Sequence, residues 1–476
     1  MNLASIVLLV ARLALPLPAP VGSDYDAARA ELETAFVSEL LRLAEEAADD
    51  RRFGRRDELL ERVLVIEPDQ RDARRTLRYR RRDGEWVRPD NWRPARDRAE
   101  GDPAADEAAD REVFAPYRDG LLALVEAHTA ERGEEWAVSV QEDLRDLMPE
   151  DAVLRELLGE VRVDGGWILE ETQRARARRV AIAAIVEKAL AEAPAPSKAQ
   201  LDRTEDAAPI EWAAGAATDR VRTLGSVPAT EVVRTARTAH AAGDVFEALL
   251  GTPAPYRRGF TIYLLDGRWQ GMEFLRTWPG LSDAVREYLR PLRGGWIEAA
   301  IRVVDWSPSP EERLDGALRQ TLGMFFESGL NIRAEQGWAW EGFGLYLTDR
   351  MLGTTLTWFV KGVGKAETRS SDSTTGVQDA RDLLAAAHRS AAGGEAPRLR
   401  FMLGRSLGDM GPSDLVRAHA LVAYLIEGHP DAVRPVLFRL GDSEHPVRVL
   451  EDELGMTLTR IEARLDRWLG EMTEAL

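Results

Sequence analysis

The sequence predicts an α+β protein: a mainly α-helical repeat in the N-terminal part, then a domain with a small β-sheet and a helical body. Three observations predict this class. A block of sequence recurs at a fixed offset within the first 180 residues, short strand-like runs follow residue 210, and helical periodicity dominates to the C-terminus. The expected parts are 1–23 (possible signal peptide), 24–100 and 101–190 (repeat units), 191–209 (linker) and 210–476 (second domain).

The repeat has an offset of 81 residues. In each copy a helix is expected first, then a second helix near a proline, then a hairpin whose Asp-Gly turn leads to a Trp. The matching positions are Leu40, Leu41, Leu43, Glu45, Pro68, Leu77 and Asp83–Trp86 in the first copy, and Leu121, Leu122, Leu124, Glu126, Pro149, Leu158 and Asp164–Trp167 in the second.

These copies resemble the tetratricopeptide-type helix pair that precedes a D-G-x-W strand in many envelope proteins. The resemblance implies a scaffold whose units bury an apolar face against one another. Concave helical surfaces of this kind often bind extended peptides. A plain spacer for the next domain fits the pattern equally well, so both interpretations stay open at this point.

Composition limits the classes of function. The chain has 476 residues, a hydrophobic fraction of 45% and 13 Trp, so it is long and apolar enough for two or three cores. The formal net charge of −18 argues against nucleic acid as a partner, and two local clusters, Arg78–Arg82 and Arg174–Arg179, are expected to be solvated surfaces. The absence of Cys excludes disulfides, thiolate zinc sites and catalytic thiols.

The N-terminus predicts export. Residues 4–19 are apolar like the core of a secretory signal, although Arg12 interrupts them, and the run is too short and Pro-rich for a stable membrane span. We therefore expect a periplasmic or secreted protein. A misplaced start codon or a disordered apolar tail is the alternative.

The second domain is expected to open with strands. Residues 220–226 and 260–265 have strand character, residues 229–250 form a helix, and residues 296–306 form one further strand. Asp266–Trp269 is a third Asp-Gly-x-Trp, which we interpret as an ordinary hairpin turn because no proline precedes it at the repeat spacing.

The most specific motif of this domain is W-x-x-E-G-x-x-x-Y at Trp338–Tyr346. On this motif, residues 210 to 470 resemble the peptidase-MA-like family, the thermolysin-type gluzincins. The resemblance implies a gluzincin-like fold in which Glu341 stands where the family has its third zinc ligand.

The family's first zinc helix carries H-E-x-x-H, in which two His bind zinc and the Glu activates a water. At the family's spacing before Glu341, this chain has Leu318-Arg319-Gln320-Thr321-Leu322. Both ligand positions, Leu318 and Leu322, are apolar, and Arg319 stands where the general base belongs. Leu314, Leu318 and Leu322 also recur at helical spacing, which predicts a buried face. The resemblance thus implies a degenerate site without metal or other cofactor.

These observations predict a non-catalytic protein that binds a protein or peptide, with Trp340, Glu341 and Tyr346 lining the possible binding cleft. Without zinc, Glu341 needs a partner, and we expect an ion pair with Arg319. A purely structural envelope scaffold is the first alternative.

A hydrolase of unrecognised type is the second alternative. Gly404–Gly408 matches the G-x-S-x-G nucleophile elbow around Ser406, after a strand-like run at 399–403. Gly408, Gly411 and Pro412 oppose a helix starting at Ser406, and Ser413 is the expected N-cap. An irregular metal site would have to use His419, His429 and His445.

Overall fold

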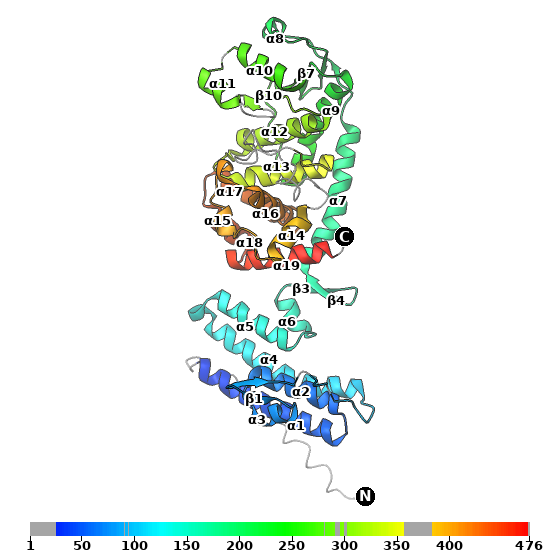
Figure 1. The fold of residues 1–476 in the computed structure, drawn as a ribbon, viewed down its shortest axis with the longest axis vertical. Coiled ribbons are helices and arrows are strands. Elements are labelled where there is room, and N and C mark those ends of the chain that lie inside the picture. The colour runs from blue at the N-terminus through cyan, green and yellow to red at the C-terminus, as the bar shows by residue number, and fades with distance from the viewer. Residues whose placement is uncertain are drawn as a thin grey trace, which may run out of the picture. The chain divides into compact units, whose positions relative to one another are not determined.

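The computed structural model describes residues 25–89, 91–93, 95–279, 281–290, 296–298, 302–356 and 383–474. The chain forms two compact units, Met1–Trp167 and Ile168–Leu476, which are described separately below (Figure 1). The possible signal peptide at 1–23 lies outside the described residues. Within the described part of the chain, no helix has both the length and the apolar character needed to cross a membrane.

The N-terminal unit consists of the two predicted copies. Each contains three helices followed by a two-stranded antiparallel hairpin. The first copy has α1 (Tyr25–Asp49), α2 (Phe53–Ile66), α3 (Arg71–Thr76), β1 (Arg80–Arg82) and β2 (Glu85–Val87). The second has α4 (Pro103–Arg132), α5 (Glu134–Leu147), α6 (Ala152–Leu157), β3 (Glu160–Val163) and β4 (Gly166–Leu169). The repeat and its hairpins are confirmed, whereas the middle helices α2 and α5 were not expected.

The two copies of the repeat also share an equivalent side-chain hydrogen bond from the Trp of the D-G-x-W motif. Trp86 Nε1 donates to Asp69 Oδ1 at 2.7 Å, and Trp167 Nε1 donates to Glu150 Oε2 at 3.3 Å. Both acceptors lie 17 residues before their Trp, just ahead of the short third helix. The Trp of each D-G-x-W motif therefore ties its hairpin to the start of that helix.

Both hairpins turn through left-handed backbone. Asp83 and Gly84 have φ of 52° and 90°, and Asp164 and Gly165 have φ of 50° and 87°. Two successive positive φ values are what a two-residue hairpin turn needs, and Asp-Gly accepts them at low cost. The motif thus fixes the turn in both copies.

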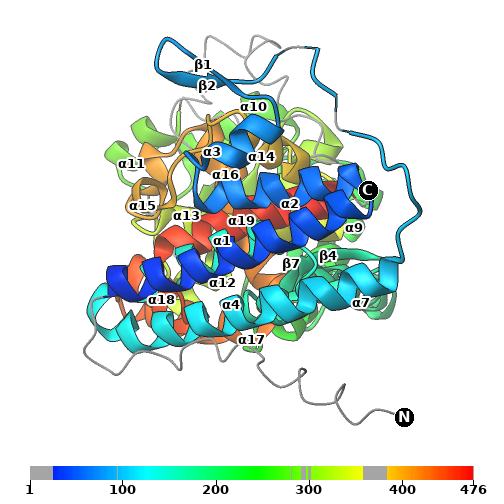
Figure 2. The same cartoon turned by 90° about the horizontal axis from the view of Figure 1, so that it is seen from below.

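The helices of this unit enclose one apolar core. α1 packs against both α2 and α4, and the three helices run side by side in Figure 2. Phe36 of α1 stacks on Tyr117 of α4, with ring centroids 4.1 Å apart and an interplanar angle of 3°. Leu40 and Leu121, matching positions of the repeat, are both buried in this core.

The C-terminal unit contains a mixed sheet in the order β5-β6-β7-β8-β10-β9. β7, β8 and β10 run parallel, while β6 and β9 pair antiparallel at their flanks. The strands are β5 (Ser197–Lys198), β6 (Ala214–Ala217), β7 (Arg222–Gly225), β8 (Thr261–Leu264), β9 (Trp296–Glu298) and β10 (Arg302–Asp305).

Two expectations about this sheet were wrong. Residues 296–306 do not form one strand, because β9 and β10 pair antiparallel and the chain reverses between them. Asp266–Trp269 is not a hairpin turn, since Asp266 is the N-cap of α10 (Gly267–Thr277). A short apolar run cannot show where the chain reverses, and Asp-Gly also suits a helix start.

Helices make up most of the other described residues of the unit. The expected helix at 229–250 is confirmed as α9 (Ala229–Leu250). The others are α7 (Glu170–Glu192), α8 (Arg203–Ala207), α11 (Asp283–Leu289), α12 (Pro310–Leu330), α13 (Gly337–Leu352), α14 (Leu383–Ala392), α15 (Leu399–Met402), the 3-10 turn η2 (Leu407–Asp409), α16 (Pro412–Ala423), the π-helix η3 (Tyr424–Gly428), α17 (Pro430–Gly441), α18 (Pro446–Leu454) and α19 (Leu458–Thr473).

The structure places the domain boundary earlier than expected. α7 was expected to close the second repeat at residue 190, but it belongs to the C-terminal unit, where it packs on α9 and η3. Ile182 and Val186 of α7 are buried in the core of that unit. The expected linker at 191–209 contains β5, which pairs with β6, and α8. Residues 168–209 are therefore part of the second domain.

Candidate functional site

The two helices of the gluzincin resemblance, α12 and α13, pack directly against each other. α12 begins with a capping box in which Ser309 and Glu312 bond each other's backbone N–H, and Pro310 follows at the first helical position. Gly323 of α12 admits the Trp340 indole, because a Cβ there would lie 2.3 Å from the Trp340 ring. The fit fixes α13 on α12 and sets the positions of the candidate residues.

The predicted apolar face of α12 is confirmed as core. Leu318 is 2% exposed and Leu322 is fully buried, and Phe325 and Phe326 are buried beside them. Aliphatic side chains cannot bind zinc. At the two positions where the resemblance places the His ligands, the chain thus has packing residues.

The expected ion pair is present. Arg319 Nη2 lies 2.6 Å from Glu341 Oε2, and both side chains are completely buried. A guanidinium at this distance places a positive charge where a divalent cation would have to sit, so these residues do not fit zinc. Among the described residues, no three His, Asp or Glu side chains are grouped so that they could hold a metal ion.

The residues expected at a binding cleft lie inside the helical packing. Trp340 is 5% exposed, and Glu341 and Tyr346 are fully buried. Tyr346 points toward another helix of the same unit, where its OH donates to Glu427 Oε1 at 3.0 Å. A partner would have to separate α13 from its neighbours to touch these side chains.

Sequence reasoning missed a second buried ion pair. Arg179 of α7 donates through Nη2 to Glu427 Oε2 at 2.8 Å and through Nε at 3.1 Å. Glu427 lies in the π-helix η3, a rare element that often marks a functional or strained position. Arg179 had been assigned to a solvated face, and this is wrong for that residue. The available signal was the single carboxylate, Glu427, directly after the largely apolar stretch 418–426.

His419 is the third polar side chain in this core. It is 1% exposed, and its Nε2 lies 4.0 Å from Asp349 Oδ2, which accepts a hydrogen bond from Arg350. Burial lowers the pKa of His419 to about 3, and the positive charges of Arg350, Arg179 and Arg319 act in the same direction. The ring is therefore neutral at neutral pH.

This burial predicts an acid-sensitive C-terminal unit. Unfolded, His419 binds a proton near pH 6.5, but in the fold it does so only near pH 3, so stability falls as the pH drops between these values. One such group contributes a slope of about 1.4 kcal/mol per pH unit. Urea unfolding at several pH values between about 4.5 and 6.5 measures the slope, and His419→Gln should flatten it by that amount.

The difference in slope between the parent and His419→Gln gives the contribution of His419 alone, because other buried groups also change stability in this pH range. His429, whose pKa burial lowers to about 4, adds a slope of the same sign. Asp305, whose pKa burial raises to about 7, opposes both, because the folded protein binds its proton more tightly. Equal slopes in the parent and in His419→Gln would contradict the prediction.

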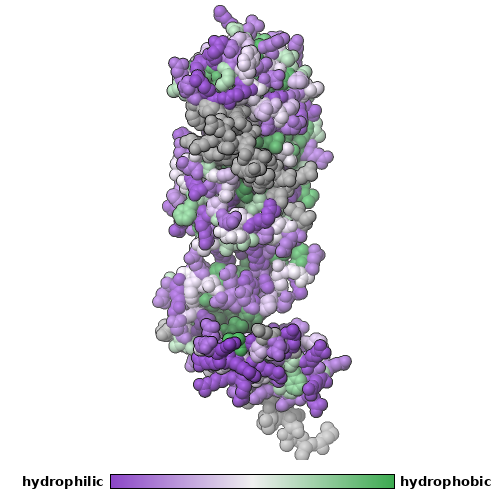
Figure 3. Space-filling model, viewed as in Figure 1, coloured by the Kyte–Doolittle hydropathy of each residue, from purple (hydrophilic) through white to green (hydrophobic). Residues whose placement is uncertain are grey.

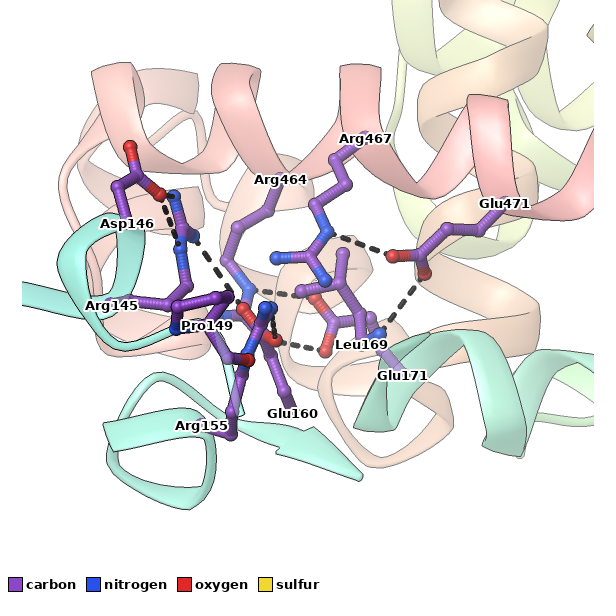
Figure 4. Close-up of polar contacts among 10 residues, drawn as sticks. All are labelled: Arg145, Asp146, Pro149, Arg155, Glu160, Leu169, Glu171, Arg464, Arg467 and Glu471. Atoms are coloured by element: carbon purple, nitrogen blue, oxygen red, sulfur yellow. Dashed lines mark hydrogen bonds and ion pairs between the residues drawn. The ribbon is translucent and has the colours of Figure 1, made fainter. Parts of the chain in front are cut away.

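Further polar contacts fix the start of α7 to the C-terminal helix. Glu171 accepts hydrogen bonds from Arg464 Nε at 2.7 Å and Nη2 at 2.6 Å, as Figure 4 shows. Glu471 accepts one from the Leu169 backbone N–H at 3.0 Å. The pKa of Glu171 is lowered, because the bonds from Arg464 outweigh the opposing effect of burial. These contacts therefore stabilise the C-terminal unit.

The structure around Ser406 lacks the strand and the helix that a serine-hydrolase nucleophile elbow needs. Residues 399–402 form the helix α15 instead of a strand, and Ser406 Oγ donates to Asp409 Oδ2 at 2.5 Å. The N-cap of α16 is Gly411, so the expected cap at Ser413 was wrong by two positions. The arrangement is not a strand–serine–helix elbow.

The three histidines considered for an irregular metal site have separate surroundings. His419 is buried next to Asp349, the His429 ring packs edge-on against Tyr424 at 4.6 Å, and His445 is exposed at the start of α18. These three histidines therefore do not form a common metal site.

No family model matches this chain, and no curated protein or solved structure is significantly similar to it. The resemblance to the peptidase-MA-like family stays a prediction that rests on the motif at Trp338–Tyr346.

Proposed function

We propose that this chain is a non-catalytic protein that binds a protein or peptide partner and belongs to a degenerate branch of the peptidase-MA-like fold. The observation that carries the first part is the buried Arg319–Glu341 pair at 2.6 Å. Together with Leu318 and Leu322, it replaces the polar, solvent-accessible metal site that peptide hydrolysis by zinc requires.

The helical repeat is the better candidate for the binding surface. Trp340, Glu341 and Tyr346 are buried, so the cleft expected from the resemblance offers no side chains to a partner. The N-terminal unit instead has two copies of a helix–hairpin motif with half-exposed Trp86 and Trp167. Repeats of this kind present extended surfaces, and specificity can differ between the copies.

Elemental analysis tests the non-catalytic part. Residues 24–476, purified without chelator and then offered excess zinc, are expected to retain less than about 0.1 zinc per chain. Zinc bound tightly at one equivalent would overturn this part of the proposal.

Chemical cross-linking in the source cells tests the binding part. The full chain should yield one defined cross-linked partner, and a chain that starts at Ile168 should not yield it. A full chain with no cross-linked partner would instead favour the purely structural alternative.

A further inference from the structure

The first repeat presents exposed arginines that the second lacks. We call Arg71 and Arg75 of α3, together with Arg78, Arg80 and Arg82 at the hairpin, the arginine surface; all five side chains are exposed. Figure 3 shows strongly hydrophilic side chains gathered on the part of this unit where Figure 1 places β1. In a chain of net charge −18, such a cluster is a local reversal of sign.

The second repeat has the same fold, so comparing the two copies shows which charged residues the fold needs. Residues 71–88 carry eight Arg and three carboxylates, a net charge of +5, whereas the matching residues 152–169 carry two Arg and three carboxylates, a net charge of −1. The positions that match the arginine surface are Ala152, Glu156, Gly159, Val161 and Val163.

Two other arginines of the first repeat contact the Trp of its hairpin. Arg74 and Arg81 lie over the Trp86 ring, at 5.7 and 5.8 Å from its centroid. The same arrangement recurs in the second copy, where Arg155 and Arg162 both lie 5.8 Å from the centroid of Trp167. Cation–π contacts thus stabilise both hairpins. The five arginines of the arginine surface are additional to this framework.

Most of the arginine surface has no partner within its own unit. Among the described residues, no carboxylate lies within ion-pair distance of Arg71, Arg78, Arg80 or Arg82, and Arg75 makes one exposed pair with Asp72 at 3.0 Å. Mutual repulsion among these charges weakens the fold slightly. Their presence therefore favours a role outside the fold.

We propose that the arginine surface binds an acidic segment of a protein partner, which deepens the proposed function and rests on it. β1 pairs with β2 so that Arg80 faces Val87 and Arg82 faces Glu85, which puts Arg80 and Arg82 on one face of the hairpin. Residues two apart on a strand lie about 6.8 Å apart. An extended peptide with Asp or Glu at alternate positions presents carboxylates at the same spacing.

Single-stranded nucleic acid fits this surface less well. Such ligands bind by stacking bases on aromatic rings, and Arg74 and Arg81 already lie over Trp86.

An anionic membrane fits less well for another reason. Stable attachment needs apolar anchors as well as basic residues, and Val87 is the one large apolar side chain of the described hairpin that is exposed. A peptide also contacts the arginine surface alone, whereas a membrane would face the acidic remainder of the chain.

Fluorescence anisotropy with the full chain tests this inference. The probe is a labelled peptide of about twelve residues that alternates Glu with Ser, at low and at physiological salt. The variant Arg78→Gly/Arg80→Thr/Arg82→Thr keeps strand residues in β1 and gives position 78 the Gly that its left-handed φ of 63° favours. Affinity for the peptide should fall about tenfold, the sum of three exposed ion pairs.

A matched control removes the same charge elsewhere. Arg174→Gln/Arg258→Gln/Arg400→Gln changes three exposed arginines of the C-terminal unit, and it should bind the peptide like the parent. Equal loss in both variants, or no binding of the peptide by the parent, would overturn the inference.

Two further probes test the choice of partner. Tighter binding to a single-stranded oligonucleotide of equal charge, or to vesicles rich in phosphatidylglycerol, would overturn the assignment to an acidic peptide. If the cross-linked partner of the full chain still binds the triple hairpin variant normally, the inference fails while the proposed function stands.

Discussion

Glu341→Met is expected to lower the free energy of unfolding of the C-terminal unit by about 3–5 kcal/mol, because it leaves the Arg319 guanidinium buried without its counter-ion. The two groups lie 2.6 Å apart with fully buried side chains, so water cannot take over the role of the lost carboxylate. Arg319→Met should have a similar effect for the converse reason. Equilibrium denaturation in urea, monitored by tryptophan fluorescence, gives both values.

The double variant Arg319→Met/Glu341→Met separates the pair from the packing around it. Both charges are then gone, so the loss should be smaller than in either single variant, and methionine fills the space without strain. Losses that simply add would show that the two residues are independent, contrary to the ion pair. Glu287→Met, which replaces an exposed carboxylate of the same unit paired with Arg290, should cost less than about 1 kcal/mol and is the surface control.

The pair also explains how a gluzincin-like plan would tolerate the loss of its metal. Where the resemblance places two neutral ligands, a carboxylate and a dication, the chain has two Leu, one Glu and one Arg. The positive charge needed next to Glu341 comes from Arg319, at the position where the resemblance places the general base. This substitution keeps the carboxylate compensated and turns the site into core.

The sequence predicted those features that depend on local pattern. The hairpins were predictable because Asp-Gly takes successive positive φ values, and the buried face of α12 because Leu314, Leu318 and Leu322 follow helical spacing. The Arg319–Glu341 pair was predictable because a carboxylate in an apolar helix needs a nearby cation, and the resemblance supplied the neighbouring helix.

Features that depend on distant contacts were not predictable in the same way. Residues 170–190 were expected to belong to the second repeat, but Glu427 and Arg464, the partners of Arg179 and Glu171 in α7, lie 248 and 293 residues further along the chain. The sequence pattern of residues 170–192 does not indicate which unit packs against the apolar face of α7. The expected cleft failed for the same reason, since the burial of Tyr346 depends on Glu427 and Arg179, which periodicity cannot locate.

A chain that starts at Ile210, the boundary expected from the sequence, is predicted not to fold. It lacks α7, which buries Ile182 and Val186, and it leaves Glu427 and Arg464 without Arg179 and Glu171. Each uncompensated buried charge costs about 3–5 kcal/mol, and each lost apolar side chain about 1.5–3 kcal/mol. The total of about 9–16 kcal/mol is as large as the roughly 5–15 kcal/mol by which a folded domain is stable.

The matched control starts at Ile168, the first residue of the C-terminal unit, and should give a cooperative thermal transition in near-UV circular dichroism. The shorter chain should give none and should aggregate, because the apolar surface of α9 that α7 covers becomes exposed. A cooperative transition at the same temperature in both chains would mean that α7 contributes little to the unit. In that case the core of the C-terminal unit would fold without the buried ion pair between Arg179 and Glu427.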